Sequence, residues 1–139
     1  MEYWAAMPIR FTIDDDRGYF VSKFEGLVSN EELLSLYQAF YRDEWRPGMN
    51  ELVDLSTADV SQITSLSLRD LATYIRRLFE EHGVDSCRTA VCAAEDSPYG
   101  LARIYKAFSL ESPESVRVFR EMAEARKWVE EQQGEQKDS

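Results

Sequence analysis

Short runs typical of β-strands alternate with amphipathic helix patterns along most of this 139-residue chain. Two β-type runs come first, at residues 9–13 and 19–24, and the turn-forming residues 14–18 between them predict a hairpin. Each later helix pattern is followed or preceded by a further β-type run, which gives the order β-β-α-β-α-β-α-β-α. This order predicts one α/β domain with a mixed, mostly parallel five-stranded sheet, right-handed crossovers and four flanking helices.

Local signals predict where the helices begin and end. Residues 29–32 (Ser-Asn-Glu-Glu) form a capping box, in which a serine oxygen and a glutamate carboxylate satisfy free backbone N–H groups. Residues 51–55 predict a short central strand, followed by a polar loop over 56–66 and a helix start at 67–70. Gly83 is placed to end that helix in a left-handed conformation. Aromatic residues at helical spacing are expected in the core, or around an apolar pocket or dimer face: Tyr37, Phe40, Tyr41, Trp45, Phe79, Tyr105 and Phe108.

Composition limits the classes of partner that we expect the protein to bind. The net charge of −10 argues against a nucleic acid, because a phosphate backbone requires a basic surface. No apolar run reaches the roughly 20 residues of a membrane span, so we expect a soluble, cytoplasmic protein. The expected domain covers residues 9–129, between an N-terminal extension (1–8) and a polar C-terminal tail (130–139).

Cofactor and catalytic motifs are not found. Cys87 and Cys92 lie five residues apart in one expected strand, so their side chains point to opposite faces and cannot pair. No Cys/His spacing suits a metal, and no cofactor is indicated. His82, the single histidine, is expected in the last helical turn rather than as a general base. The sequence therefore specifies no enzymatic reaction.

The element order and two segments resemble the SpoIIAA-like group of the STAS superfamily, in particular its uncharacterised bacterial branch. The segments are Arg46-Pro-Gly-Met49 leading into Leu52-Val-Asp-Leu55, and Tyr99-Gly-Leu-Ala-Arg103; the resemblance covers the chain from about Pro8 to Val129. It implies a small non-enzymatic domain that binds partner proteins, and some relatives bind nucleotides or lipids. A kinase or an anti-sigma-like protein is the implied partner.

The phosphorylation motif of the anti-sigma antagonists is half present. Asp54-Leu55-Ser56 matches their strand end, but residues 61–67 lack the Asp-Ser-Ser-Gly helix start that a partner kinase modifies. By position alone, four hydroxyl residues remain candidate phosphoacceptors or partner-binding residues: Ser61, Thr64, Ser65 and Ser67. We expect regulatory protein–protein interaction as the function, with this segment as the recognition surface.

A second hypothesis is a small-ligand or lipid-binding module. Ligands of open α/β sheets lie beyond the carboxyl ends of the strands, which selects two groups of candidate residues: Asp54, Ser56 and Asp59 in one loop, and Asp96, Ser97, Tyr99 and Arg103 in the other. Simpler roles remain open, since Asp96 or Ser97 can cap a helix before Pro98, and Asp54 and Asp59 can cap loops rather than bind magnesium. Homodimerisation is compatible with the sequence.

Overall fold

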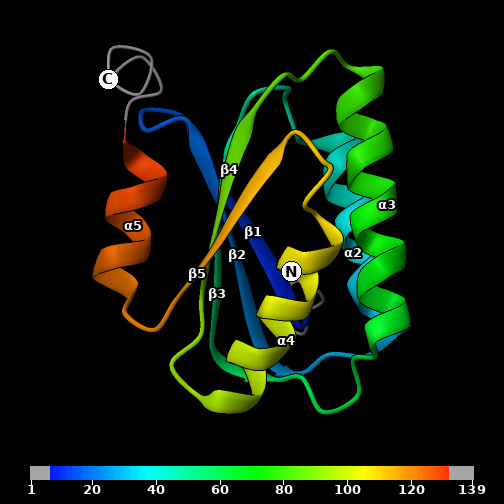
Figure 1. The fold of residues 1–139 in the computed structure, drawn as a ribbon, viewed down its shortest axis with the longest axis vertical. Helices are drawn as coiled ribbons and strands as arrows, with labels where there is room; N and C mark the ends of the chain where they lie inside the picture. Colours follow the sequence, from blue (N-terminus) through cyan, green and yellow to red (C-terminus); the bar gives the residue numbers. More distant parts are fainter. Residues whose placement is uncertain (1–6, 132–139) are drawn as a thin grey trace.

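The computed structural model describes residues 7–131 of the chain, and the expected element order is confirmed (Figure 1). The five strands lie in the sheet in their sequence order, β1-β2-β3-β4-β5. The first pair is antiparallel and the others are parallel. The elements are β1 (Ile9–Asp14), β2 (Tyr19–Leu27), α2 (Asn30–Asp43), β3 (Asn50–Asp59), α3 (Ser65–Glu81), β4 (Cys87–Cys92), α4 (Asp96–Phe108), β5 (Glu114–Phe119) and α5 (Met122–Glu130).

The strand order explains how the helices are layered. Each crossover from β2 to β5 steps in the same direction across the sheet, so right-handed connections bring α2, α3 and α4 to the same face. The helix α5 follows the last strand and covers the opposite face (Figure 1). The expected sheet with four flanking helices is therefore confirmed.

The two faces bury cores of different size. The larger core lies under α2, α3 and α4 and contains most of the buried aromatic residues. The smaller one lies under α5 and is built around Tyr19, Leu52 and Trp128. Cys87 belongs to the first core and Cys92 to the second, as the odd spacing predicts, and both are free thiols.

The region between β3 and α3 differs from the prediction. β3 continues to Asp59 and α3 begins at Ser65, so the loop is shorter than residues 56–66. Residues 57–59 pair with β2 beyond the end of β4, and this one-sided pairing permits the polar, exposed sequence that predicts a loop. Thr64 caps α3 by accepting a hydrogen bond from the Ser67 N–H.

Of the other local predictions, some are confirmed and others are wrong. The capping box at Ser29 and the left-handed Gly83 (φ 68°) are confirmed. The predicted cap at Asp96 or Ser97 is wrong, because Glu95 is the N-cap of α4 and makes no side-chain cap hydrogen bond. Phe108 is not a core residue, since 39% of it is exposed. The predictions for residues 1–6 and 132–139 lie outside the described residues.

Candidate functional site

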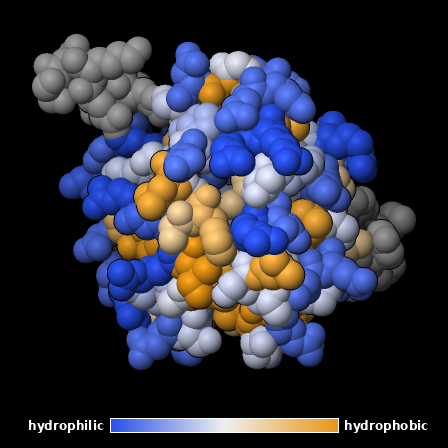
Figure 2. Space-filling model, turned by 45° about the vertical axis from the view of Figure 1, so that its right-hand side comes forward, coloured by the Kyte–Doolittle hydropathy of each residue, from blue (hydrophilic) through white to orange (hydrophobic). Residues whose placement is uncertain are grey.

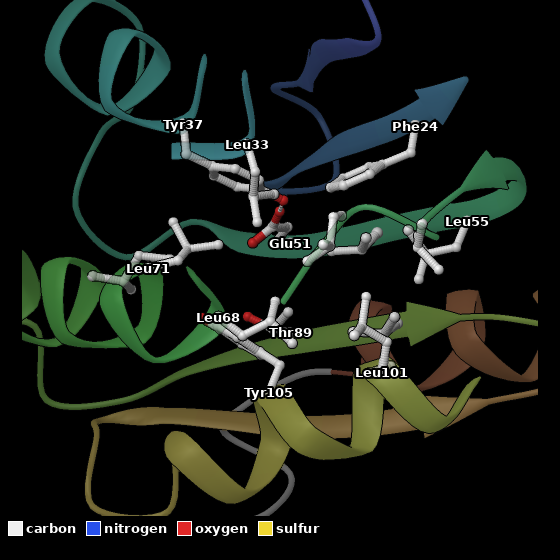
Figure 3. A pocket seen from close by; sticks show the side chains of 16 residues that line it. Phe24, Leu33, Tyr37, Glu51, Leu55, Leu68, Leu71, Thr89, Leu101 and Tyr105 are labelled. Carbon is white, nitrogen blue, oxygen red and sulfur yellow. Dashed lines mark hydrogen bonds between the residues drawn. The ribbon is translucent and has the colours of Figure 1, made fainter. Parts of the chain in front are cut away.

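A cavity of about 60 Å³ lies between the sheet and the three helices α2, α3 and α4 (Figure 3). It extends from the carboxyl end of β3 toward the middle of the sheet, and its wall is almost entirely apolar. Polar groups reach it at one end from β3, β4, α2 and α4. The lining residues are Phe24, Leu33, Tyr37, Glu51, Val53, Leu55, Val60, Ile63, Leu68, Leu71, Ile75, Thr89, Val91, Leu101, Ala102 and Tyr105.

Glu51 on β3 is the charged residue of this lining. Its position places it in phase with Val53 and Leu55, so its side chain points to the same buried face as theirs. Ser22 and Tyr37 each donate a hydrogen bond to Oε2, both at 2.6 Å. Oε1 accepts no hydrogen bond from the described residues, and Figure 3 shows the carboxyl group directed into the space between the labelled side chains. The cavity therefore offers one free acceptor.

A second buried carboxyl group, Glu114 on β5, lies behind the polar end of the cavity. The Thr89 hydroxyl donates to its Oε2 at 2.5 Å and the Tyr105 hydroxyl donates to its Oε1 at 2.9 Å. Thr89 and Tyr105 themselves line the cavity. Glu51 and Glu114 are each only 4% exposed, and both are held by hydroxyl groups alone.

Burial governs the protonation of these groups. It raises the pKa of Glu51 from 4.5 to about 7, although the hydrogen bonds from Ser22 and Tyr37 oppose the shift. It also raises the pKa of Glu114, against the hydrogen bonds from Thr89 and Tyr105. Burial and the Glu51 carboxyl raise the pKa of Tyr37 well above its usual value, so its hydroxyl stays a donor. Near neutral pH, Glu51 can thus change its charge.

Sequence reasoning missed Glu51 and Glu114, although a signal for them exists. Each is an acidic residue in phase with apolar residues of a strand, Glu51 with Val53 and Glu114 with Val116. A carboxyl group at such a position must be buried with partners or must serve a site. The partners themselves come from elements far away in the sequence and carry no comparable signal.

The candidate residues Asp54, Ser56 and Asp59 belong to β3 itself and lie outside the cavity. Asp54 Oδ1 accepts from the Ser56 N–H at 2.9 Å, and its Oδ2 pairs with Lys23 Nζ at 3.3 Å. Asp59 Oδ1 accepts from the Ser61 N–H at 3.0 Å. Each aspartate thus accepts a hydrogen bond from the backbone N–H two residues further along the chain. No group of three or more potential metal ligands occurs among residues 7–131.

The candidate residues around the start of α4 are also outside the cavity. Asp96 pairs with Arg120 at 2.9 Å, and the same guanidinium donates to the Ala94 carbonyl at 2.8 Å. The Arg120 guanidinium lies 3.9 Å from the centre of the Tyr99 ring. Ser97 and Arg103 are exposed. Arg120, which sequence reasoning did not select, is therefore the cation that reaches Asp96.

The candidate phosphoacceptors lie at or just before the start of α3. Thr64 exchanges two hydrogen bonds with the Asn30 side chain, at 3.1 and 3.3 Å, which ties the first turns of α2 and α3 together. Ser61 and Ser65 are exposed and Ser67 is half-buried. Leu66, beside Ser65, is 57% exposed. Ser65 is thus an exposed hydroxyl residue in the first turn of α3.

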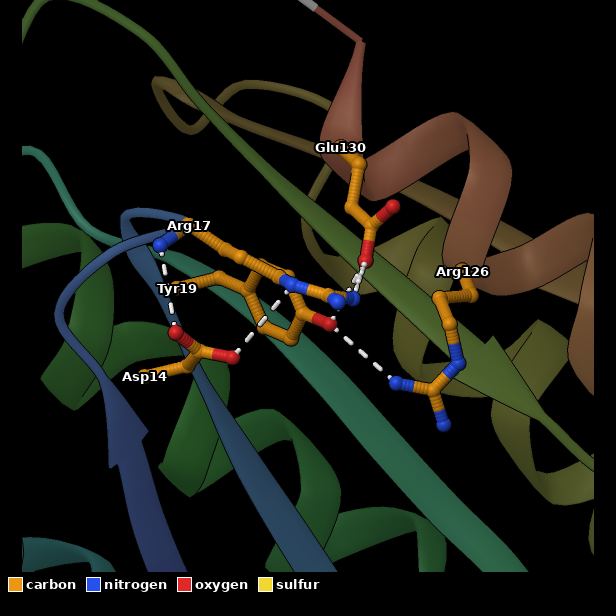
Figure 4. Close-up of polar contacts among 5 residues, drawn as sticks. All are labelled: Asp14, Arg17, Tyr19, Arg126 and Glu130. Carbon is orange, nitrogen blue, oxygen red and sulfur yellow. Dashed lines mark hydrogen bonds and ion pairs between the residues drawn. The ribbon is translucent and has the colours of Figure 1, made fainter.

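The opposite face of the sheet carries a polar cluster of a different kind (Figure 4). Glu130 at the end of α5 accepts from Arg17 at 2.7 Å and from the Tyr19 hydroxyl at 2.9 Å. Arg126 donates to that hydroxyl at 3.2 Å, and the Arg17 N–H donates to Asp14. These contacts join α5 to the β1–β2 turn, which is a structural role. His82 likewise has a local role, since its Nδ1 lies 2.9 Å from the Leu78 carbonyl at the end of α3.

Part of the outer surface near α4 is apolar. Ile104 and Phe108 are 37% and 39% exposed, and Leu110 after the helix is 75% exposed. Figure 2 shows hydrophobic side chains gathered in the middle of one face of the molecule, surrounded by polar ones. No helix among residues 7–131 is long and apolar enough to cross a membrane.

Strand order and helix placement define a SpoIIAA-like fold. A solved structure with this fold is similar to the chain: an uncharacterised Shewanella loihica protein of the DUF3478 family. The two are 19% identical with a TM-score of 0.51, and the match covers 87% of this chain and 91% of that one. The resemblance drawn from the sequence is therefore confirmed for the fold. The chain matches no protein-family model and no curated protein.

Proposed function

We propose that this SpoIIAA-like domain is a non-enzymatic module that binds a small, mostly apolar ligand in the cavity between the sheet and α2, α3 and α4. The observation that supports it is Glu51 Oε1, which faces the cavity at its polar end and accepts no hydrogen bond from the described residues. An apolar pocket with a few convergent polar groups and perturbed pKa values is the usual form of a ligand site.

The cavity volume limits the size of the ligand. A cavity of roughly 150 Å³ binds benzene, so one of about 60 Å³ suits a ligand of only a few non-hydrogen atoms. For about three such atoms, at about 1.5 kcal/mol each, the binding free energy reaches at most about 4.5 kcal/mol. The corresponding Kd is about 0.5 mM or weaker. Binding is therefore best tested at millimolar ligand concentration.

Methyl-group NMR with a panel of probes of about two or three non-hydrogen atoms tests the proposal. Saturable shifts are expected for methyl groups of lining residues such as Leu33, Leu55 and Ile63. Ala102→Leu extends a side chain into the cavity and should abolish them. Ala107→Leu makes the same change at an exposed position of α4 and should leave them intact. Equal shifts in both variants, or none in the wild type, would contradict cavity binding.

A second candidate function is partner binding at the start of α3, in line with the regulatory role expected of STAS domains. The observation that favours it is the exposed pair Ser65 and Leu66 in the first helical turn, where the chain has no acidic residue. A phosphate on Ser65 would be stabilised there by the helix dipole and could be bound by an arginine of a partner. The acidic chain is also complementary to a basic partner surface.

Pull-down with the full chain tests this second candidate. The double variant Ser65→Ala/Ser67→Ala preserves the cap, because Thr64 accepts from the backbone N–H of residue 67. It should lose phosphorylation-dependent partners, whereas Ser115→Ala on β5, an exposed serine outside this surface, should retain them. Identical partner sets for the two variants would remove the candidate.

A further inference from the structure

The two buried carboxyl groups near the cavity lack a neutralising charge. No ion pair among residues 7–131 involves Glu51 or Glu114. Their hydrogen-bond partners are the hydroxyl groups of Ser22, Tyr37, Thr89 and Tyr105. A buried carboxylate normally pairs with a cation, since removing its charge from water has a large cost.

The acceptor available to a ligand is also fixed by the geometry. Ser22 and Tyr37 both donate to Glu51 Oε2, which leaves Oε1 for a donor inside the cavity. An anionic ligand would be repelled by Glu51 and by Glu114 behind it. A cation would be attracted by both carboxyl groups, at the end of the cavity that Tyr37 and Tyr105 also line.

We propose that the ligand of this cavity is a small protonated amine, whose ammonium group donates to Glu51 Oε1 while its alkyl part contacts the apolar wall. This inference rests on the proposed cavity binding and specifies the chemical class of the ligand. The wall that receives the alkyl part is formed by residues such as Leu55, Ile63, Leu68 and Leu101. The geometry selects against a carboxylic acid and gives an amine an advantage over an alcohol of the same shape.

A size-matched series distinguishes the class of ligand from binding itself. The probes are ethylamine hydrochloride, ethanol and sodium formate, titrated into the full chain and followed by methyl NMR. We expect ethylamine to bind at least about tenfold more tightly than ethanol, a difference typical of a charge-assisted hydrogen bond. Formate should not bind. Glu51→Gln should remove the preference for the amine, and Glu130→Gln, on the opposite face, should retain it.

The pH dependence in the wild type gives a test that needs no variant. The titratable groups that act on Glu51 or its hydrogen-bond partners are Tyr37 and Tyr41 from α2, Cys87 from β4, Tyr105 from α4 and Glu114 from β5. The tyrosine hydroxyls and the thiol stay neutral up to pH 8, because burial raises their pKa values. Binding of an ammonium ion requires the ionised carboxylate, so affinity for ethylamine should rise about tenfold from pH 6 to pH 8.

The outcomes separate the two proposals. If ethanol binds as tightly as ethylamine, or ethylamine binds no better at pH 8 than at pH 6, the amine proposal is wrong and cavity binding stands. If formate binds best, the amine proposal is likewise wrong. If none of the three probes shifts the cavity methyl groups, both proposals fail.

Discussion

The two faces of the sheet bury charged side chains in different ways. Under α5, the Arg88 side chain is 7% exposed, and its Nη1 donates to the Trp128 carbonyl at 2.7 Å and pairs with Glu131 at 3.0 Å. Its guanidinium also lies 4.8 Å from the centre of the Trp128 ring. Under α2, α3 and α4, Glu51 and Glu114 have only hydroxyl partners and a cavity beside them. The α5 face is thus complete, in the sense that its buried charge is paired within the protein. The other face has a cavity beside two buried carboxyl groups that form no ion pair among the described residues.

The largest effect is expected where the α5 face is most tightly packed. Trp128→Ala removes a buried ring that contacts Arg88, Arg117 and Phe119, so the free energy of unfolding should fall by about 3–5 kcal/mol in urea denaturation. Phe108→Ala, which truncates an exposed aromatic residue of α4, should cost less than about 1 kcal/mol. A similar cost for both would show that α5 is not part of the closed core.

The second prediction concerns pH and the face with the cavity. The unfolded chain releases the Glu51 proton near its ordinary pKa of 4.5, whereas the folded protein holds it until about pH 7. Because the folded state binds more protons in this window, the free energy of unfolding should fall as the pH rises from 4.5 to 7, by up to about 3 kcal/mol. Burial of Glu114, which also raises its pKa, acts with the same sign. Glu51→Gln should flatten this decline in urea titrations.

Glu130 on the α5 face provides the opposite sign as a control. Burial raises the pKa of Glu130, but hydrogen bonds from Tyr19 and Arg17 outweigh burial and lower it overall. Its contribution to stability is therefore present above its unfolded pKa and is lost as the pH falls through the folded pKa. Glu130→Gln should change the acid limb only. An unchanged slope between pH 5 and 7 in Glu51→Gln would contradict the buried, protonated carboxyl group.

The third prediction compares the free space in the two cores by making the same alanine-to-leucine substitution in each. Ala102 on α4 lines the cavity, whereas Ala125 on α5 is fully buried at 0% exposure in the smaller core. Ala125→Leu should lower the free energy of unfolding by about 1–3 kcal/mol through overpacking. Ala102→Leu should change it by less than about 1 kcal/mol or increase it, because the new methyl groups enter the cavity. Equal losses in chemical denaturation would mean that the cavity cannot accept added atoms.

The features that were predicted correctly from the sequence depend on residues that lie close together in the chain. The hairpin at Gly18, the capping box at Ser29 and the end of α3 at Gly83 are local signals, and the structure confirms them. The end of β3 was predicted too early, because its last residues are held by pairing with β2 rather than by their own composition.

The candidate cavity could not be predicted for the same reason. Glu51 receives hydrogen bonds from Ser22 and Tyr37, which are 29 and 14 residues away and belong to other elements. Helical spacing placed Tyr37 and Tyr105 on apolar stripes, and the same spacing suits core residues and pocket residues alike. Only the in-phase acidic residues of β3 and β5 carried information about this site in the sequence.

The smallest effect is expected for the ion pair at the edge of the α5 face. The Arg17 side chain is 54% exposed, and Glu130, its partner at 2.7 Å, is 31% exposed. An exposed ion pair adds little to the free energy of unfolding, because water and salt screen the charges and both side chains lose conformational freedom. Arg17→Ala should lower Tm by no more than about 3 °C, and the difference should vanish in 1 M NaCl. Arg42→Ala, which removes an exposed pair with the adjacent Asp43, should leave Tm unchanged.

If the loss of Tm in Arg17→Ala persists in 1 M NaCl, attraction between the charges of Arg17 and Glu130 does not explain it, because salt screens that attraction. The remaining explanation is that Arg17 positions Glu130, which also accepts a hydrogen bond from the hydroxyl of the buried Tyr19. In that case Tyr19→Phe should reproduce the loss, and the β1–β2 turn would belong to the same closed unit as Arg88 and Trp128. If Tyr19→Phe has no effect, the polar cluster of Figure 4 lies outside that unit, and the completeness of the α5 face rests on Arg88 and the aromatic packing around Trp128.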